Sequence, residues 1–144
     1  MRRFAFITGY ENTVLLPERK TAFSAGYDFS AVEETVCLPG KVTIIKTGVK
    51  AYMPSDEYLA LYVRSSTAIK KGLFMANSVG IIDADYVDNA DNEGHIMIAL
   101  YNSTDHSVTV ASGERIAQGI FTKYQLTDSD NVSSTRCGGI GSTD

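Results

Sequence analysis

The residue types that build membrane spans, disulfide frameworks and zinc sites are scarce in this sequence. No apolar stretch approaches the roughly 18 residues that cross a bilayer. The N-terminal apolar run Phe4–Ile7 ends at Thr8 and is too short for the hydrophobic region of a signal peptide. Two cysteines, Cys37 and Cys137, fit neither a disulfide framework nor a CxxC pair, and two histidines cannot supply zinc-site spacings. We therefore expect a cytoplasmic protein with free thiols and no membrane contact.

A broad basic surface is also missing. The 13 Lys and Arg residues are outnumbered by 17 Asp and Glu residues, which gives a formal charge of −4. Stable binding to nucleic acid through its phosphates is therefore not expected. The negative charge is concentrated, because the segment from Gly72 to Glu114 contains seven acidic residues and no Lys or Arg. The total excludes a basic surface, but it does not exclude a site for one polyanionic ligand.

Short runs rich in Val, Ile, Thr and Tyr recur between turn signals, whereas no stretch of a dozen residues keeps the apolar spacing of an amphipathic helix. The chain has 144 residues, 44% of them apolar, which suits one folded domain. Many short strands favour an all-β sandwich or jelly-roll barrel, because such sheets bury one face on each other. We predict strands at Phe4–Thr8, Thr13–Leu16, Thr35–Leu38, Val42–Lys50, Tyr58–Val63, Val79–Asp85, Gly94–Asn102, Val108–Val110 and Arg115–Tyr124.

One short helix is predicted at Ser65–Lys71. A serine can cap its N-terminus, Lys70 and Lys71 suit the negative end of the helix dipole, and Gly72 can terminate it. At seven residues, this helix is a connector between strands.

The apolar pattern stops after Tyr124. Residues 125–144 are mainly Ser, Thr, Asp and Gly, so they cannot offset their ordering entropy by burial. The sequence therefore predicts a domain over residues 1–124 and a flexible C-terminal arm over residues 125–144. The arm is either simply disordered or ordered over a phosphate ligand, since Arg136, the glycines after it and two hydroxyls are the parts of an anion-binding nest.

Three familiar site motifs are excluded. The run Gly139-Ile140-Gly141 does not follow a strand and open a helix, as a dinucleotide fingerprint must. In the acidic run from Asp83, Val87 and Asp88 occupy positions where a calcium loop needs a ligand and a glycine. No phosphate-binding P-loop run occurs.

Five segments, in order along the chain, carry a more specific signal. Together they resemble the five motifs of the homotrimeric dUTP pyrophosphatases (dUTPases), and the resemblance covers nearly the whole chain from Ala25 to Thr143. The loop Val87–Glu93 resembles the variant of Gram-positive bacteria and their phages. The segments are Ala25–Phe29, Arg64–Ser66, Asn77–Tyr86, Gly113–Gln118 and Arg136–Thr143.

The resemblance implies a jelly-roll fold and a homotrimer whose sites gather motifs from several subunits. It also implies hydrolysis of dUTP to dUMP and pyrophosphate, by attack of water on the α-phosphorus with Mg²⁺ on the triphosphate. Asp83 matches the carboxylate that activates the water. Asp28 is expected to meet the Mg²⁺ only through water, or to contact neighbouring groups of the site.

The resemblance also assigns the substrate contacts. Tyr86 is expected to pack on the deoxyribose and exclude a 2′-hydroxyl, which requires a bend after Asp85. Asn77 is expected near the water and the uracil, and the backbone around His95 and Ile96 is expected to read the base, with the His95 side chain on the surface. The full implied set is Arg64, Ser65, Ser66, Asn77, Gly80, Ile82, Tyr86, His95, Ile96, Gln118, Arg136, Ile140, Gly141, Ser142 and Thr143.

Structural roles remain open beside these assignments. From position alone, Asp83 and Asp28 suit turns, Tyr86 suits a core and Ser65 suits a helix cap; Arg115 is expected to pair with a carboxylate. The sequence also departs from the family at Ile140, where a phenylalanine that stacks on uracil is usual.

Two other functions are considered. A dCTP deaminase shares the fold but carries a glutamate at the position of Ala99, and alanine cannot transfer a proton. A regulatory trimer that binds a phage-type repressor is the second alternative, and intact Asp83 and Tyr86 argue against a loss of catalysis. Release of pyrophosphate from dUTP distinguishes these functions.

Overall fold

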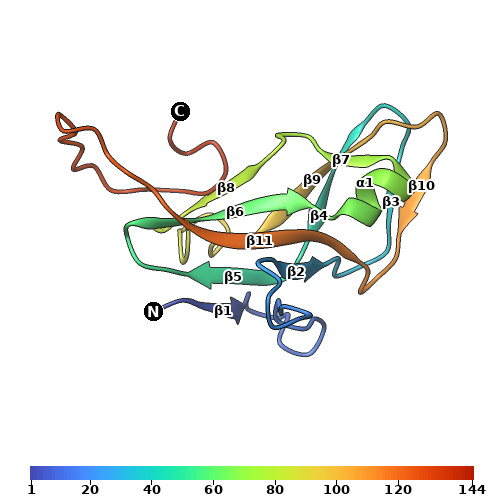
Figure 1. Cartoon of the computed structure of the whole chain (residues 1–144), viewed down its shortest axis with the longest axis horizontal. Helices are drawn as coiled ribbons and strands as arrows, with labels where there is room; N and C mark the ends of the chain where they lie inside the picture. The colour runs from blue at the N-terminus through green and yellow to red at the C-terminus, as the bar shows by residue number, and fades with distance from the viewer.

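Eleven strands and one short helix make up the protein in this computed structural model, which describes residues 1–144 (Figure 1). The order is β1 (Arg3–Phe6), β2 (Tyr27–Ser30), β3 (Thr35–Cys37), β4 (Val42–Lys46), β5 (Val49–Tyr52), β6 (Glu57–Val63), α1 (Ser65–Lys71), β7 (Leu73–Met75), β8 (Gly80–Asp83), β9 (Met97–Asn102), β10 (Val108–Val110) and β11 (Arg115–Lys123).

The strands form four antiparallel sheets. The largest has the order β2-β11-β6-β8, the second has the order β4-β9-β7, and the pairs β1-β5 and β10-β3 complete the fold. Every connection between neighbours in a sheet is antiparallel, which lets one face pack on the core while the other faces solvent. The predicted all-β class with one short helix is confirmed.

The core lies between the two larger sheets. Phe29 of β2, Leu59 and Leu61 of β6, and Ile98 and Leu100 of β9 are almost completely buried and belong to one cluster. The alternate residues of β9 are more exposed, as expected for a strand with one buried face. Burial of these side chains supplies the main driving force for the arrangement.

Two strand predictions need correction. Residues Thr13–Leu16 form no strand, and the side chain of Leu15 is exposed, because this segment has no partner in a sheet. The predicted strand Val42–Lys50 is two strands that belong to different sheets. The break falls at Gly48, which has a left-handed φ of 72° and leaves room for the ring of Tyr10, 2.9 Å from where a Cβ would lie. Strands β2 and β7 were not predicted.

Helix α1 has the predicted bounds, but Ser65 is not its cap. The N-cap residue is Arg64, and no side chain caps the helix, so Ser65 is the first helical residue. At the other end Gly72 adopts the expected left-handed conformation, with a φ of 66°, and donates its N–H to Ala68. No helix of the chain is long and apolar enough to cross a membrane.

Candidate active site

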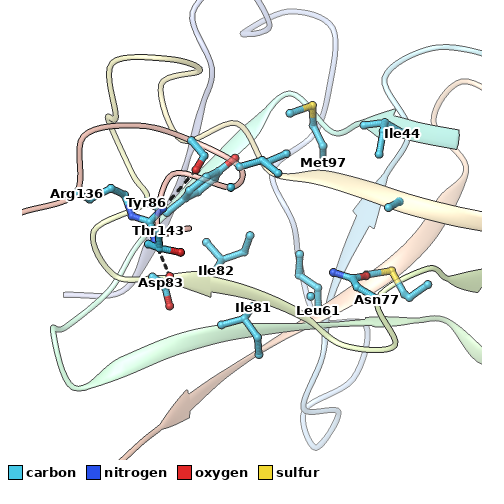
Figure 2. Close-up of a pocket in the computed structure, with 16 residues that line it drawn as sticks. Ile44, Leu61, Asn77, Ile81, Ile82, Asp83, Tyr86, Met97, Arg136 and Thr143 are labelled. Atoms are coloured by element: carbon cyan, nitrogen blue, oxygen red, sulfur yellow. Dashed lines mark hydrogen bonds and ion pairs between the residues drawn. The ribbon is translucent and has the colours of Figure 1, made fainter. Parts of the chain in front are cut away.

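A pocket of about 300 Å³ opens beside β8 and is closed on one side by the C-terminal arm. Its volume suits a small ligand such as a nucleoside. Figure 2 shows Asp83, Tyr86 and Arg136 at one end of the pocket and Asn77 at the other. The lining includes most of the predicted site residues from two motifs: Asn77, Gly80, Ile82, Asp83, Tyr86, Arg136, Ile140, Gly141 and Thr143.

Asp83 is the last residue of β8 and projects into this pocket. Pairing of Asp83 with Tyr58 of β6 fixes its backbone, while its side chain remains half exposed. The chain turns immediately after it, and the N–H of Tyr86 donates to the carbonyl of Asp83 at 3.1 Å. The predicted bend exists, but it begins after Asp83 rather than after Asp85. It places the carboxylate and the Tyr86 ring in one pocket.

Arg136 binds both carboxylates of this turn. Its Nη2 lies 2.6 Å from Oδ2 of Asp83, and its Nε lies 2.8 Å from Oδ1 of Asp85. The hydrogen bond to Asp85 raises the pKa of the guanidinium above its ordinary value. Nη1 also donates to the hydroxyl of Ser142 at 3.0 Å. The arginine therefore carries the arm to the carboxylates of its own chain, whereas its polar composition suggested an arm that leaves the domain.

Tyr86 is both a buried side chain and a wall of the pocket. Only 6% of the residue is exposed, and burial raises the pKa of its hydroxyl. The hydroxyl donates to the carbonyl of His95 at 2.9 Å and accepts from Nδ2 of Asn92 at 2.8 Å. The guanidinium carbon of Arg136 lies 5.7 Å from the ring centroid. These contacts fix a flat apolar face beside Asp83, so the core role and the binding role are compatible.

The expected surface position of the His95 side chain is wrong. The residue is 7% exposed, its ring packs edge-on against Tyr10, and Nε2 accepts the N–H of Gly48 at 2.8 Å. Burial lowers the pKa of His95 and favours the neutral ring that this acceptor role requires.

The backbone of His95 and Ile96 is already engaged within the chain. The N–H of Ile96 donates to Val49 and its carbonyl accepts from Thr47, while the carbonyl of His95 accepts from Tyr86. Neither residue lines the pocket. Base reading by this segment therefore stays a prediction without support from the pocket geometry.

The remaining predicted residues gather elsewhere. Asp28, on β2, pairs through Oδ1 with Nε of Arg64 at 3.1 Å and through Oδ2 with Nη1 of Arg115 at 3.2 Å. Arg115 thus has the predicted carboxylate partner. Gln118 lies opposite Asp28 in the β2-β11 pairing. We call this set, with Ser65 and Ser66 at the start of α1, the Asp28 group.

The Asp28 group does not contribute to the Asp83 pocket. None of its members lines that pocket, and α1 lies at the opposite end of the molecule from the C-terminus (Figure 1). Neither Ser65 nor Ser66 has a hydrogen-bond partner for its hydroxyl within the protein, so both hydroxyls are available to a ligand. Each chain therefore carries two separate parts of the predicted site.

The residues of one chain do not form a cage for Mg²⁺. No group of three or more His, Cys, Asp and Glu side chains comes together. Both carboxylate oxygens of Asp28 bind guanidinium groups, which disfavours direct coordination of a cation. The donor set fits only a cation that is held mainly by ligand phosphates, with at most a water-mediated contact to a carboxylate.

Several residues of the site were not predicted. Asp85 binds Arg136, and Asp91 accepts the N–H of Gly139 at 2.9 Å. Met97 and Ile44 line the apolar side of the pocket. The sequence signals were weak: Asp85 lies two residues after Asp83, and Asp91 belongs to a loop that was noted only for its length.

Known proteins give a consistent identification. The dUTPase family profile matches residues 12–143. The deoxyuridine 5′-triphosphate nucleotidohydrolase of Lactococcus lactis is 45% identical over 99% of this chain and 97% of its own length. The crystal structure of the dUTPase of Streptococcus mutans superposes with a TM-score of 0.84 and 48% identity, over 87% of this chain and 98% of that chain.

A more distant structure supports the fold alone. The dUTPase of the Staphylococcus aureus phage phi11 is 20% identical, with a TM-score of 0.77 over 93% of this chain and 97% of that chain, and it coordinates a structural Mg(II) ion. Together with the match over residues 12–143, the nearer relatives decide the assignment. The chain belongs to the dUTPase family.

Proposed function

We propose that this protein hydrolyses dUTP to dUMP and pyrophosphate, the reaction of the family to which it belongs. The observation that carries the proposal is the position of Asp83, which lies at the end of a nucleoside-sized pocket, beside the Tyr86 ring and beneath the arm. In nucleotide metabolism this reaction keeps uracil out of DNA and supplies dUMP for dTMP synthesis.

In the proposed reaction, Asp83 accepts a proton from a water molecule as the water oxygen forms a bond to the α-phosphorus. The bond between the α-phosphorus and the bridging oxygen breaks, and pyrophosphate leaves. Arg136 would exchange its carboxylate partners for phosphate oxygens when dUTP binds, because guanidinium recognises both kinds of anion. Mg²⁺ bound to the triphosphate would neutralise part of its charge.

The pocket also supports a choice of substrate. The fixed face of Tyr86 leaves no room for a 2′-hydroxyl on a sugar packed against it, which favours deoxyribonucleotides. Ala99 lines the pocket at the position where a deaminase carries its glutamate, and it offers no proton-transfer group. This geometry favours hydrolysis of dUTP over deamination of dCTP.

We further propose a homotrimer in which a neighbouring subunit completes each site. The proposal is supported by the separation of the Asp28 group from the Asp83 pocket within one chain. A triphosphate beside Asp83 would then meet Arg64, Ser66 and Gln118 of another subunit. Sedimentation at the mass of one 15.6 kDa chain would contradict this assembly.

The function is tested by measuring pyrophosphate release from dUTP, dCTP, dTTP and UTP in the presence of Mg²⁺. Rapid release from dUTP alone is expected. Ammonia release from dCTP would instead support a deaminase. A trimer that hydrolyses none of the four nucleotides would overturn the proposal and leave the repressor-binding alternative, for which the structure supplies no residue.

A further inference from the structure

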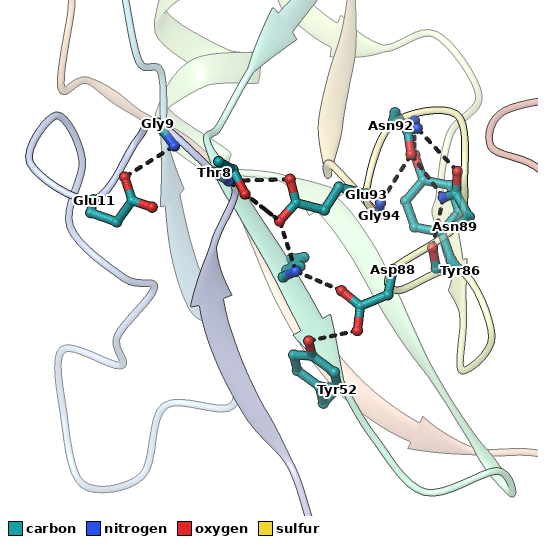
Figure 3. Close-up of polar contacts among 11 residues, drawn as sticks. Thr8, Gly9, Glu11, Tyr52, Tyr86, Asp88, Asn89, Asn92, Glu93 and Gly94 are labelled. Atoms are coloured by element: carbon teal, nitrogen blue, oxygen red, sulfur yellow. Dashed lines mark hydrogen bonds and ion pairs between the residues drawn. The ribbon is translucent and has the colours of Figure 1, made fainter.

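The loop between the Tyr86 turn and β9, residues 87–94, has a shape that is fixed by its own side chains. Oδ1 of Asn89 accepts the N–H groups of Asp91 at 3.0 Å and Asn92 at 3.1 Å. Oδ1 of Asn92 accepts Nδ2 of Asn89 at 2.8 Å and the N–H of Gly94 at 3.0 Å (Figure 3). A loop with this many internal bonds presents a defined surface rather than a range of conformations.

Lys50 of β5 clamps the base of the loop. Its Nζ lies 2.5 Å from Oδ1 of Asp88 and 2.9 Å from Oε1 of Glu93, and the residue is only 8% exposed. Burial alone would lower the pKa of Lys50, but the two carboxylates outweigh burial and raise it. Asp88 also accepts the hydroxyl of Tyr52, and Glu93 also accepts the backbone N–H and hydroxyl of Thr8 (Figure 3).

The clamped residues adopt backbone conformations that need such support. Asp88 and Glu93 have φ values of 58° and 63°, in the left-handed region that residues with side chains rarely adopt. Gly94 follows with a φ of 84°, and a Cβ there would lie 2.7 Å from the Cα of Val87. The two ends of the loop therefore approach each other closely, and Lys50 binds both.

The tip of the loop contacts the C-terminal arm. Oδ2 of Asp91 accepts the N–H of Gly139 at 2.9 Å, and a Cβ on Gly138 would lie 2.3 Å from the same oxygen. A Cβ on Gly139 would lie 2.9 Å from Nδ2 of Asn92. The arm glycines are thus matched to the loop by close approach, and both are buried although neighbouring arm residues are exposed.

We infer that the 87–94 loop is the docking platform of the arm, with Asp91 and Lys50 as positioning residues for the proposed hydrolysis of dUTP. Asp91 holds Gly139, and Arg136 lies three residues earlier, so this contact keeps the guanidinium over Asp83. Lys50 holds the loop in the shape that presents Asp91. The inference rests on the proposed function and adds to it how the arm is placed.

Steady-state kinetics with dUTP test the role of Asp91. Asp91→Ala should lower kcat/KM roughly tenfold, mainly by raising KM, because a charge-assisted hydrogen bond that places the phosphate-binding arm is lost. Asp91→Asn retains an acceptor oxygen and should recover part of the loss. Asp105→Ala is the matched control, since Asp105 is an exposed loop acid that contacts only its neighbour His106; its kcat/KM should be unchanged.

Trypsin digestion reports the arm directly. The Arg136 side chain is 8% exposed, whereas that of Lys123, just before the arm, is 69% exposed and serves as an internal reference. Cleavage after Arg136 relative to Lys123 should accelerate in Asp91→Ala and in Lys50→Met. The double variant should be no faster than Asp91→Ala alone, because the loop acts on the arm through Asp91.

Unchanged kcat/KM together with unchanged cleavage in Asp91→Ala would overturn the platform. Equal losses in Asp91→Ala and Asp91→Asn, with no effect on cleavage, would also overturn it, since the oxygen acceptor would then be irrelevant. Failure of the proposed function looks different: the unaltered protein would release no pyrophosphate from dUTP, while the digestion would still measure arm docking.

Discussion

Replacement of Gly26 by alanine should weaken substrate binding through its neighbour Gln118. A Cβ on Gly26 would lie 2.3 Å from Oε1 and 2.9 Å from Cβ of Gln118, so the amide must move. Gly26 does not have a left-handed φ, and the alanine backbone is therefore unstrained. If Gln118 donates to a phosphate, the lost bond to a charged acceptor is about 1.5–3 kcal/mol. That loss corresponds to a fall in kcat/KM of roughly 10- to 150-fold.

A double-mutant cycle with pyrophosphate release as the assay isolates this effect. Gln118→Ala alone should lower kcat/KM by a similar factor, and Gly26→Ala should add little in that background. The melting temperature measures any general damage to the fold and should change little. Full additivity of the two changes, or an unaltered kcat/KM in Gly26→Ala, would refute the proposed coupling.

Three further predictions concern the pocket and its support. Asp83→Asn should lower kcat at least ~100-fold while dUTP binding by calorimetry survives; retained turnover would remove Asp83 as the base. Ile140→Phe should lower KM up to ~10-fold, since a ring adds base stacking; an unchanged KM would argue against a role of the lid residue. The unfolding free energy should fall as pH drops below about 6.5, because folded His95 has a lowered pKa and the unfolded chain binds the proton more readily. Urea titrations should show that His95→Gln removes this slope and exposed His106→Gln keeps it; a slope that persists in His95→Gln would exclude His95 as its cause.

The sequence was sufficient where local signals determine the structure. The bounds of α1 were predicted because Gly72 ends the helix within a few residues of its start. Strands that bury one face, such as β6, were found from their composition. The motif order also brought Asp83, Tyr86 and Arg136 into one pocket, as predicted.

The errors arose where distant residues decide the outcome. Thr13–Leu16 has strand-forming residues, but pairing depends on a partner strand that the local sequence does not reveal. The break at Gly48 depends on the ring of Tyr10, and the burial of His95 depends on the N–H of Gly48, which lies 47 positions away. The latch between Asp91 and Gly139 likewise joins residues 48 positions apart.

The separation of the Asp28 group from the Asp83 pocket bears on genetics as well as on assembly. In the proposed trimer, a chain with a defective Asp28 group can still lend its Asp83 to a neighbour, and a chain without Asp83 can lend its Asp28 group. Two alleles that are each inactive alone would then restore activity when co-expressed. Complementation between alleles would thus report which motifs act across a subunit boundary, and two alleles within the same group would fail to complement.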